Sequence, residues 1–457
     1  MEDVAGALCG YCGAMYRLFS WEHSYFSAKA RAYLRYKERC GALGPGFEDI
    51  LATPELINGL LIPATGSNLV PQLQTPGGDL IQDTSEILDV CEAAHPDVPV
   101  IPDVDRPKQR LVSYLIELLA DEWLVVPGFW TRWYYSEDGR QPNHRKFNEH
   151  QFGAVLSPDG DGAERRKSGA MLFEERFGIS TSRSDPKGTY AGLVHLGCNE
   201  ETEQAWEASL YRILERLEAH FELHDYLLGG RPSMGDFALL GPLYAHIYRD
   251  AVTGFMLRSE YPLVAEWVER ANGEGSLNAR TYNQKLYSLD EQGQLVGRVA
   301  NSDGGEWLAD DEVPETLIGV LEVFFDEMWP FLLASIEKLE AFIAGEDHQV
   351  GGELPNKTFF ASPGFLEHQT NGGALTVSFK IGDVDSERMV VPYQIWMLNR
   401  LESAMEAVMG SDEGRSSVAD LLEAFPEGDR MMELETLLSG CRIEKRGGKF
   451  FSVDFRR

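Results

Sequence analysis

The spacing of apolar residues changes near residue 100, and this change constrains the fold more than any other feature of the chain. Before it, Met15–Ser20 predicts a short strand, and Ser24–Arg39 carries apolar residues at helical spacing. Leu69–Leu73 and Leu80–Ile81 predict two strands around a Pro-Gly-Gly turn, and Asp83–Ala93 predicts a second helix. This order of strand, helix, strand, strand and helix indicates a small α/β domain.

A proline-rich linker at residues 98–107 separates this region from a mainly helical one. Residues 135–200 interrupt the helical region with a stretch rich in glycine and charge. We interpret this stretch, which includes SPDGDGAERRKSGA, as a surface loop or flexible insertion. The helices predicted beyond the linker are Gln109–Val126, Glu201–Leu223, Gly235–Tyr248 and Thr316–Ile343.

The pattern changes again after residue 345. GALTVSFKIG predicts a strand, and Tyr393–Met409 predicts a helix with an apolar face. CRIEKRGGKFFSVDF predicts a terminal hairpin that turns at Gly447-Gly448. We therefore predict an α/β domain at 1–97, a helical domain at 107–345 and an α+β C-terminal extension at 346–457.

The net charge of −32 argues against nucleic acid as a partner, because a phosphate backbone would be repelled. Anionic membranes are disfavoured for the same reason, and no run of about 18 apolar residues predicts a transmembrane helix. The N-terminal segment lacks the basic and apolar regions of a secretion signal. The six cysteines are too scattered for a disulfide framework, so we expect a cytoplasmic protein.

The turn between the first strand and the first helix is the first candidate site. Ser24 stands at the helix N-terminus, where free N–H groups and a partial positive charge stabilise a thiolate. Its hydroxyl could donate a hydrogen bond to that thiolate. Ser27, in the same helical turn, is a second hydroxyl candidate. The alternative is that Ser24 serves only as a helix cap.

Two further motifs are candidate ligand contacts. Val70-Pro71 lies between two predicted strands, and a cis bond there would turn the backbone of Val70 toward a ligand. Asp83-Thr84 precedes a helix, where N–H groups and hydroxyls suit a carboxylate and Asp83 suits an ammonium. The alternatives are an ordinary edge-strand proline and a capping cluster.

The order and spacing of these motifs resemble the glutathione transferase superfamily. The resemblance covers residues 1–134 and 200–270 well, and similarity to long bacterial members extends into 300–410. It is carried by Ser24-Tyr25-Phe26-Ser27 with Lys29 and Arg31, by LVPQL, by QDTSEIL, and by LLGGRPSMGDFALLGPLYAH, where Ser233 and Asp236 form a capping box.

The resemblance implies a thioredoxin-like domain that binds glutathione, followed by an all-helical substrate domain, usually in a homodimer. Ser24 would contact the glutathione sulfur, and the backbone of Val70, before a cis Pro71, would pair with the cysteinyl part. Asp83 and Thr84 would hold the γ-glutamyl group. The chain departs from the common pattern in having Tyr25 instead of proline, Asp-Thr instead of Glu-Ser, and no cysteine in the tetrad. The missing cysteine argues against a disulfide or dehydroascorbate reductase.

An aromatic cluster follows the first helix of the predicted substrate domain. In the family this helix lines the electrophile pocket, and aromatic rings would suit a flat or apolar substrate. The alternative is core packing. Arg132 could bind an anionic substrate group, or it could form an ordinary ion pair. The pocket candidates are Trp123, Trp130, Trp133 and Tyr134, with Tyr135 beside them.

The remaining motifs carry less weight. We reject a redox role for Cys9 and Cys12, because they precede the first strand whereas the candidate site follows it. The ten histidines show no metal-ligand spacing, so we expect no metal. Three functions stay open: transfer of the glutathione thiol to an electrophilic small molecule; a glutathione-dependent isomerase, lyase or dehalogenase; and a non-catalytic interaction protein. The resemblance does not identify the electrophile.

Overall fold

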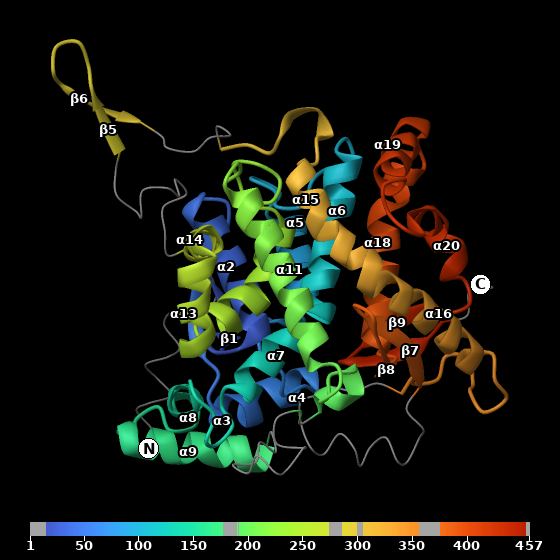
Figure 1. Cartoon of the computed structure of the whole chain (residues 1–457), viewed down its shortest axis with the longest axis horizontal. Helices are drawn as coiled ribbons and strands as arrows, with labels where there is room; N and C mark the ends of the chain where they lie inside the picture. Colours follow the sequence, from blue (N-terminus) through green and yellow to red (C-terminus); the bar gives the residue numbers. More distant parts are fainter. Residues whose placement is uncertain are drawn as a thin grey trace.

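The structure is a computed structural model that describes residues 15–176, 190, 192–273, 286–298, 305–355 and 375–453. Cys9 and Cys12 lie outside these residues. Figure 1 shows a helical body with a small sheet on one side and the C-terminal elements packed on the other. In the parts of the chain that are described, no helix combines the length and the apolar character that crossing a membrane requires.

The N-terminal part is a four-stranded mixed sheet with the order β2-β1-β3-β4, as the fold class predicts. β1 pairs parallel with β2, and the other neighbours pair antiparallel. The sequence prediction missed β2, because its residues are mostly exposed at the sheet edge and show no apolar alternation. The elements are β1 (Tyr16–Ser20), α2 (Tyr25–Arg39), β2 (Phe47–Leu51), α3 (Pro54–Leu56), η1 (Ile57–Leu61), α4 (Ile62–Thr65), β3 (Gln72–Gln74), β4 (Leu80–Gln82) and α5 (Thr84–Ala94).

The middle of the chain is helical, and the predicted helices are confirmed. Several run on through π-helical turns, so that α6, η2 and α7 form one nearly continuous path through the body (Figure 1). The elements are α6 (Pro107–Leu118), η2 (Leu119–Trp123), α7 (Val125–Tyr134), α11 (Glu203–Phe221), α12 (Met234–Leu240), η5 (Gly241–Tyr248), α13 (Ala251–Glu260), α14 (Pro262–Ala271), α15 (Glu315–Val323), η8 (Phe324–Met328) and α16 (Trp329–Ile343).

The interpretation of residues 135–200 as a surface loop or flexible insertion is wrong over Arg145–Leu156, which forms a helix, and over the second half of SPDGDGAERRKSGA. Most of the segment lies in α9 (Gly162–Met171), which packs against α8 (Arg145–Leu156). Asp161 caps α9 by accepting the N–H groups of Ala163 and Glu164, each at 2.9 Å. A methyl group at Gly169 would lie 1.8 Å from the carbonyl oxygen of Glu149, so only glycine allows this approach. Gly169, which suggested a loop, is therefore a contact between two helices.

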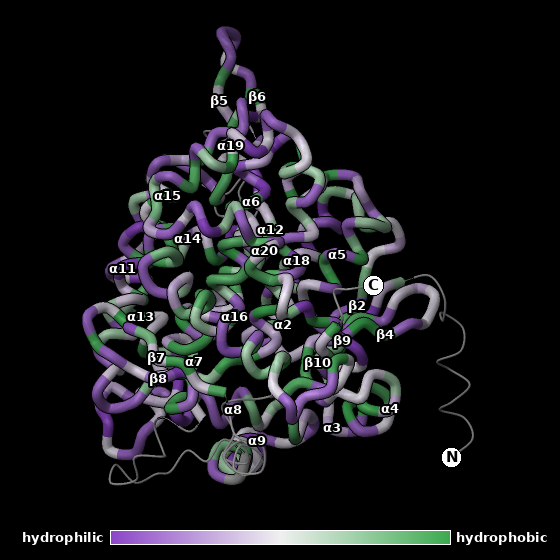
Figure 2. Tube along the Cα trace, turned by 90° about the vertical axis from the view of Figure 1, so that its right-hand side faces the viewer, coloured by the Kyte–Doolittle hydropathy of each residue, from purple (hydrophilic) through white to green (hydrophobic). Residues whose placement is uncertain are grey.

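The C-terminal part combines two hairpins with helices, as predicted for an α+β extension. Helix α18 packs along α6, and the hairpin β9–β10 lies beside β4 (Figure 2). A separate hairpin of the middle region, β5 (Leu286–Leu289) with β6 (Leu295–Arg298), projects from the body (Figure 1). The C-terminal elements are β7 (Thr376–Ile381), β8 (Val384–Met389), α18 (Pro392–Met409), α19 (Asp412–Leu422), η9 (Gly428–Glu433), α20 (Leu434–Leu437), β9 (Ile443–Arg446) and β10 (Lys449–Ser452).

One continuous apolar core joins the three parts of the chain. It includes Leu18 from the sheet, Trp123 from the helical body and Ile395 from the C-terminal extension, all fully buried. The domain boundaries at residues 97, 107 and 345 stay predictions. The apolar core includes residues on both sides of each boundary.

Candidate functional site

The register of the sheet brings the three candidate motifs to one edge. Phe19, next to the end of β1, pairs with Gln72, and Gln72 pairs with Gln82 at the end of β4. The turn after β1, the loop before β3 and the turn after β4 therefore leave the sheet at the same edge. These are the segments that carry Ser24, Val70-Pro71 and Asp83-Thr84.

Ser24 caps α2, as its position in the sequence predicts. Its backbone is extended, with φ −87° and ψ 131°, and its hydroxyl oxygen accepts the N–H of Ser27 at 3.3 Å. A hydroxyl that accepts one bond still has a hydrogen to donate. Ser24 is partly exposed, whereas Ser27 is fully buried and its hydroxyl oxygen accepts the N–H of Trp21 at 3.3 Å. Of the two serines, only Ser24 is exposed to solvent.

The Val70-Pro71 peptide bond is cis, as predicted. Pro71 is buried and Val70 is partly exposed. The side chain of Gln72 fixes the loop before the bond by donating to the carbonyl oxygens of Ser67 at 2.9 Å and Leu69 at 3.0 Å.

Asp83 is the N-cap of α5 and has a φ of 109° and a ψ of 130°. Such a backbone is rare for a residue other than glycine and costs roughly 1–3 kcal/mol. One carboxylate oxygen accepts the N–H groups of Ser85 at 3.0 Å and Glu86 at 3.4 Å. The other oxygen lies 3.4 Å from the Nζ atom of Lys445, on β9. The ammonium of Lys445, near the C-terminal end of the chain, therefore binds Asp83, the carboxylate that we predict to hold the ammonium of a ligand.

The predicted pocket tryptophans are packed as core residues. Trp123 and Trp133 have no exposed surface and Trp130 has 2%. The indole N–H of Trp123 donates to Glu327 at 3.2 Å. Tyr134 is partly exposed, with its ring 4.7 Å from that of Trp130. This packing supports the core alternative for the three tryptophans, and the pocket role stays a prediction.

A small cavity lies elsewhere, between α7, α11 and α13. Tyr135, Leu210, Tyr211 and Met256 are among its lining residues, and none of the four predicted pocket residues lines it. Among the described residues, no group of three or more histidine, cysteine or acidic side chains is arranged to hold a metal ion.

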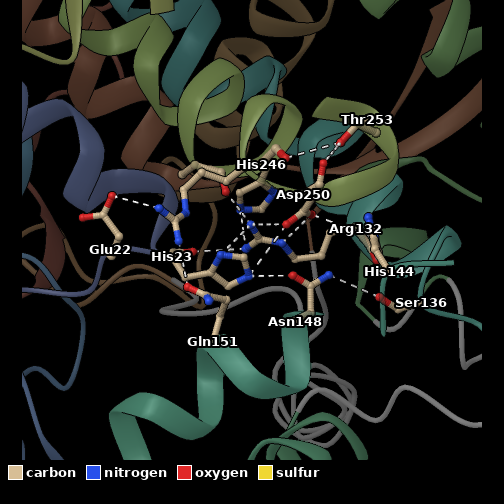
Figure 3. Close-up of polar contacts among 12 residues, drawn as sticks. Glu22, His23, Arg132, Ser136, His144, Asn148, Gln151, His246, Asp250 and Thr253 are labelled. Atoms are coloured by element: carbon tan, nitrogen blue, oxygen red, sulfur yellow. Dashed lines mark hydrogen bonds and ion pairs between the residues drawn. The ribbon is translucent and has the colours of Figure 1, made fainter. Parts of the chain in front are cut away.

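Arg132 is the centre of a buried polar cluster beneath the Ser24 turn (Figure 3). Its guanidinium binds Asp250 through two bonds of 2.9 Å and 3.1 Å. It also donates to the carbonyl oxygen of His23 at 3.1 Å, while the His23 ring lies 2.8 Å from Asn148 of α8. Arg132 is therefore engaged within the protein and does not face a substrate. The cluster ties the Ser24 turn to the helical body and to the insertion.

The histidines of this cluster are held neutral. Burial and the neighbouring Arg132 lower the pKa of His23 and of His246 well below the usual range. His246 lies 3.0 Å from a guanidinium nitrogen of Arg132 and 2.7 Å from the carbonyl oxygen of Gly128.

A second buried cluster, centred on Lys29, lies beneath the Asp83 turn. The Nζ atom of Lys29 lies 2.6 Å from Asp121, 2.7 Å from Glu117 and 3.2 Å from the hydroxyl of Ser85. Arg400 of α18 binds Glu117 from the opposite side. Burial raises the pKa of Asp121 to about 7, whereas the cations Arg400 and Lys29 outweigh burial and lower the pKa of Glu117 to about 2. This cluster locks α2 and α6 to the C-terminal extension.

The helical body carries the predicted capping box at the start of α12. The backbone N–H and the hydroxyl of Ser233 both donate to one oxygen of Asp236, at 2.7 Å and 2.9 Å. The other oxygen accepts the indole N–H of Trp267 at 3.0 Å. Asp236 thereby joins α12 to α14.

Fold and site together define a thioredoxin-like sheet followed by an all-helical bundle. Residues 200–270 match the family model described as glutathione S-transferase, C-terminal domain. The helical part of the chain from α11 to α14 is therefore similar to the C-terminal domain of glutathione S-transferases. No curated protein matches the sequence.

Several solved structures are similar at low identity. Beta-etherase LigF from Sphingobium sp. strain SYK-6 is 18% identical over 59% of this chain and 97% of its own, with a TM-score of 0.36. A glutathione S-transferase from Methylobacterium radiotolerans, solved with glutathione sulfonate, is 20% identical over 59% and 92%, with a TM-score of 0.34.

Proposed function

We propose that this protein binds glutathione at the edge of the sheet and activates its thiol for attack on an electrophilic small molecule. The observation that supports this most is the convergence of Ser24, Val70-Pro71 and Asp83-Thr84 at one sheet edge, which the strand register establishes. The sulfur would lie at the N-terminus of α2, and the γ-glutamyl group would lie at the N-terminus of α5.

The chemistry follows from the helix end and the hydroxyl. A free thiol titrates near about 8.5, so only a few per cent is thiolate at neutral pH. The partial charge of α2 and a hydrogen bond from Ser24 stabilise the thiolate. The thiolate then forms a bond to an electrophilic carbon, whose leaving group departs with the bonding electrons, and the thiol proton passes to solvent. An isomerase, lyase or dehalogenase would use the same thiolate.

Calorimetry with glutathione tests the site. Thr84→Ala removes a predicted partner of the γ-glutamyl carboxylate, and a hydrogen bond to a charged group is worth roughly 1.5–3 kcal/mol. We expect at least about a tenfold loss of affinity. Thr75→Ala, in the turn between β3 and β4, is the matched control and should bind like the wild type. Equal binding by wild type and Thr84→Ala would place the ligand elsewhere.

A substrate panel tests the reaction. Halogenated, epoxide and aryl-ether compounds are offered with glutathione, and products are identified by mass spectrometry. A glutathione conjugate supports transfer, whereas product without net loss of glutathione supports the isomerase or lyase alternative. Binding without turnover of any compound would favour a non-catalytic protein. The homodimer and the cytoplasmic location stay predictions, and sedimentation analysis tests the first.

A further inference from the structure

The hairpin β9–β10 lies directly on the segments that would hold the γ-glutamyl end of glutathione. A methyl group at Gly448 would lie 3.8 Å from the side-chain oxygen of Gln82 and 4.0 Å from the Cβ atom of Ser67. A methyl group at Gly66 would lie 3.7 Å from the carbonyl oxygen of Gly447. The turn of the hairpin thus contacts both the loop before Pro71 and the end of β4.

Lys445 carries the most specific part of this contact. Its Nζ atom lies 3.4 Å from Asp83 and 3.2 Å from Glu86, and it donates to the carbonyl oxygen of Gln82 at 3.2 Å. The ring of Trp396 lies 5.1 Å from the same atom, which adds a cation–π contact. The Lys445 side chain is 6% exposed, whereas that of Lys449, on the same hairpin, is 61% exposed.

An amino acid ligand and Lys445 present the same chemistry to Asp83. Each brings an ammonium with three N–H donors and one positive charge. One oxygen of Asp83 already accepts two N–H groups and the other lies 3.4 Å from Lys445, so a ligand ammonium would compete with Lys445 for that oxygen. Removal of Lys445 alone would leave Asp83 and Glu86 beside each other without their cation, so a ligand that brings its own ammonium is the natural replacement.

The hairpin is separate from the four-stranded sheet against which it lies. β10 pairs with β9 and forms one isolated antiparallel bridge, between Phe451 and Glu353. A two-stranded hairpin is marginally stable by itself. Its anchors to the rest of the extension include the N–H of Ile443 on Asn399 at 2.9 Å and the N–H of Leu354 on the carbonyl oxygen of Phe450 at 2.8 Å.

We propose that the C-terminal hairpin is an internal occupant of the γ-glutamyl end of the site, and that the Lys445 ammonium must withdraw before glutathione can bind there. This inference rests on the proposed function. It makes the hairpin a gate: only molecules in which the hairpin is undocked can bind glutathione, so the apparent affinity falls in proportion to that undocked fraction.

Calorimetry with glutathione on full-length variants tests the gate. Lys445→Gln should bind glutathione at least about tenfold more tightly than the wild type, because the site is then competent in most molecules. Lys449→Gln should bind like the wild type, because Lys449 pairs only with the exposed Glu353 at 2.8 Å among the contacts described. In the Lys445→Gln background, Asp83→Ala should weaken binding at least about tenfold.

The outcomes separate the two proposals. Equal affinity of wild type and Lys445→Gln would overturn the gate and leave the proposed function intact. Absence of binding by both proteins at millimolar glutathione would overturn both.

Hydrogen exchange on the wild type gives a second readout that needs no substitution. Saturating glutathione should speed exchange at residues 443–452 and slow it at the N-terminus of α5. Slower or unchanged exchange in the hairpin, with α5 protected, would show that glutathione binds without displacing it and would overturn the gate.

Discussion

The two ends of the candidate site differ in how they are built. At the thiol end, Ser24 and Ser27 are neighbours in the sequence, and their hydrogen bonds remain within the turn from Trp21 to Ser27. At the γ-glutamyl end, the cation that meets Asp83 also binds Gln82, from which it is 363 residues distant in the chain. A local motif reveals the first end, whereas only the folded chain reveals the second.

The buried clusters beneath the two ends also differ in charge. Beneath the thiol end, Arg132 and Asp250 neutralise each other, and the pKa values of His23 and His246 are lowered by burial and Arg132. Beneath the γ-glutamyl end, Lys29 forms ion pairs with the carboxylates of both Glu117 and Asp121, and burial raises the pKa of Asp121 to about 7. Acid should therefore weaken the first cluster more than the second.

The largest expected effect comes from breaking the cluster at the thiol end. Asp250→Ala leaves Arg132 buried without its carboxylate, which costs about 3–5 kcal/mol in the free energy of unfolding. Denaturant unfolding measures the loss. Asp385→Ala removes an exposed ion pair with Lys380 and should change the free energy by less than about 0.5 kcal/mol. A loss below about 1 kcal/mol for Asp250→Ala would show that the Arg132 cluster does not hold this end together.

Acid should weaken the same cluster to a smaller degree. The folded pKa values of His23 and His246 lie below the unfolded value near about 6.5, so the unfolded state binds more protons as pH falls below it. Each histidine then lowers the free energy of unfolding by up to about 1.4 kcal/mol per pH unit. Unfolding between pH 7.5 and 5.5 checks this. His246→Gln should flatten the dependence, and the same slope in wild type and variant would contradict it.

The next effect concerns thiol activation. Ser24→Ala should raise the pKa of the bound glutathione thiol by about one unit, which is about 1.4 kcal/mol. Ser27→Ala should leave it near the wild-type value, because Ser27 is fully buried and bonded to the backbone of Trp21. Ultraviolet titration of saturated protein measures both. The reverse pattern would assign activation to Ser27, and no shift in either would leave the helix end as the source.

The smallest effect is expected from the N-terminal cysteines. Cys9→Ser combined with Cys12→Ser should leave glutathione-dependent turnover almost unchanged, because both residues precede β1 whereas the site follows it. Steady-state kinetics with the best compound of the panel measures this. A loss of more than about tenfold would restore the redox interpretation of this pair.

The sequence predicts best where local rules decide. Ser24, Val70-Pro71 and the helix after Asp83 were identified from caps, turns and spacing, and the structure has Ser24 as a cap, a cis bond at Pro71 and a helix beginning at Thr84. It predicts poorly where tertiary contacts decide. Gly169 suggested a loop because close helix packing has no local signature.

The same limit explains the tryptophans and the missed lysine. A tryptophan such as Trp123 suits a substrate pocket and a buried core equally well, so the sequence alone cannot distinguish these two roles. The residues around Lys445 do not reveal its role, because a hairpin exposed to solvent and a hairpin packed against the sheet have similar sequences. A buried cation needs a carboxylate, and that carboxylate lies in a different part of the chain.

The shared apolar core has a practical meaning for anyone who shortens this chain. A protein cut at residue 345 would lose α18 and so uncover the side of α6 against which that helix packs. It would also remove Arg400, one of the two cations that bind Glu117, and leave Lys29 as the other. Such a fragment would be an incomplete part of a single cooperative folding unit, and we expect it to aggregate. Helix α18 of the extension is therefore an integral part of the fold and not a detachable tail.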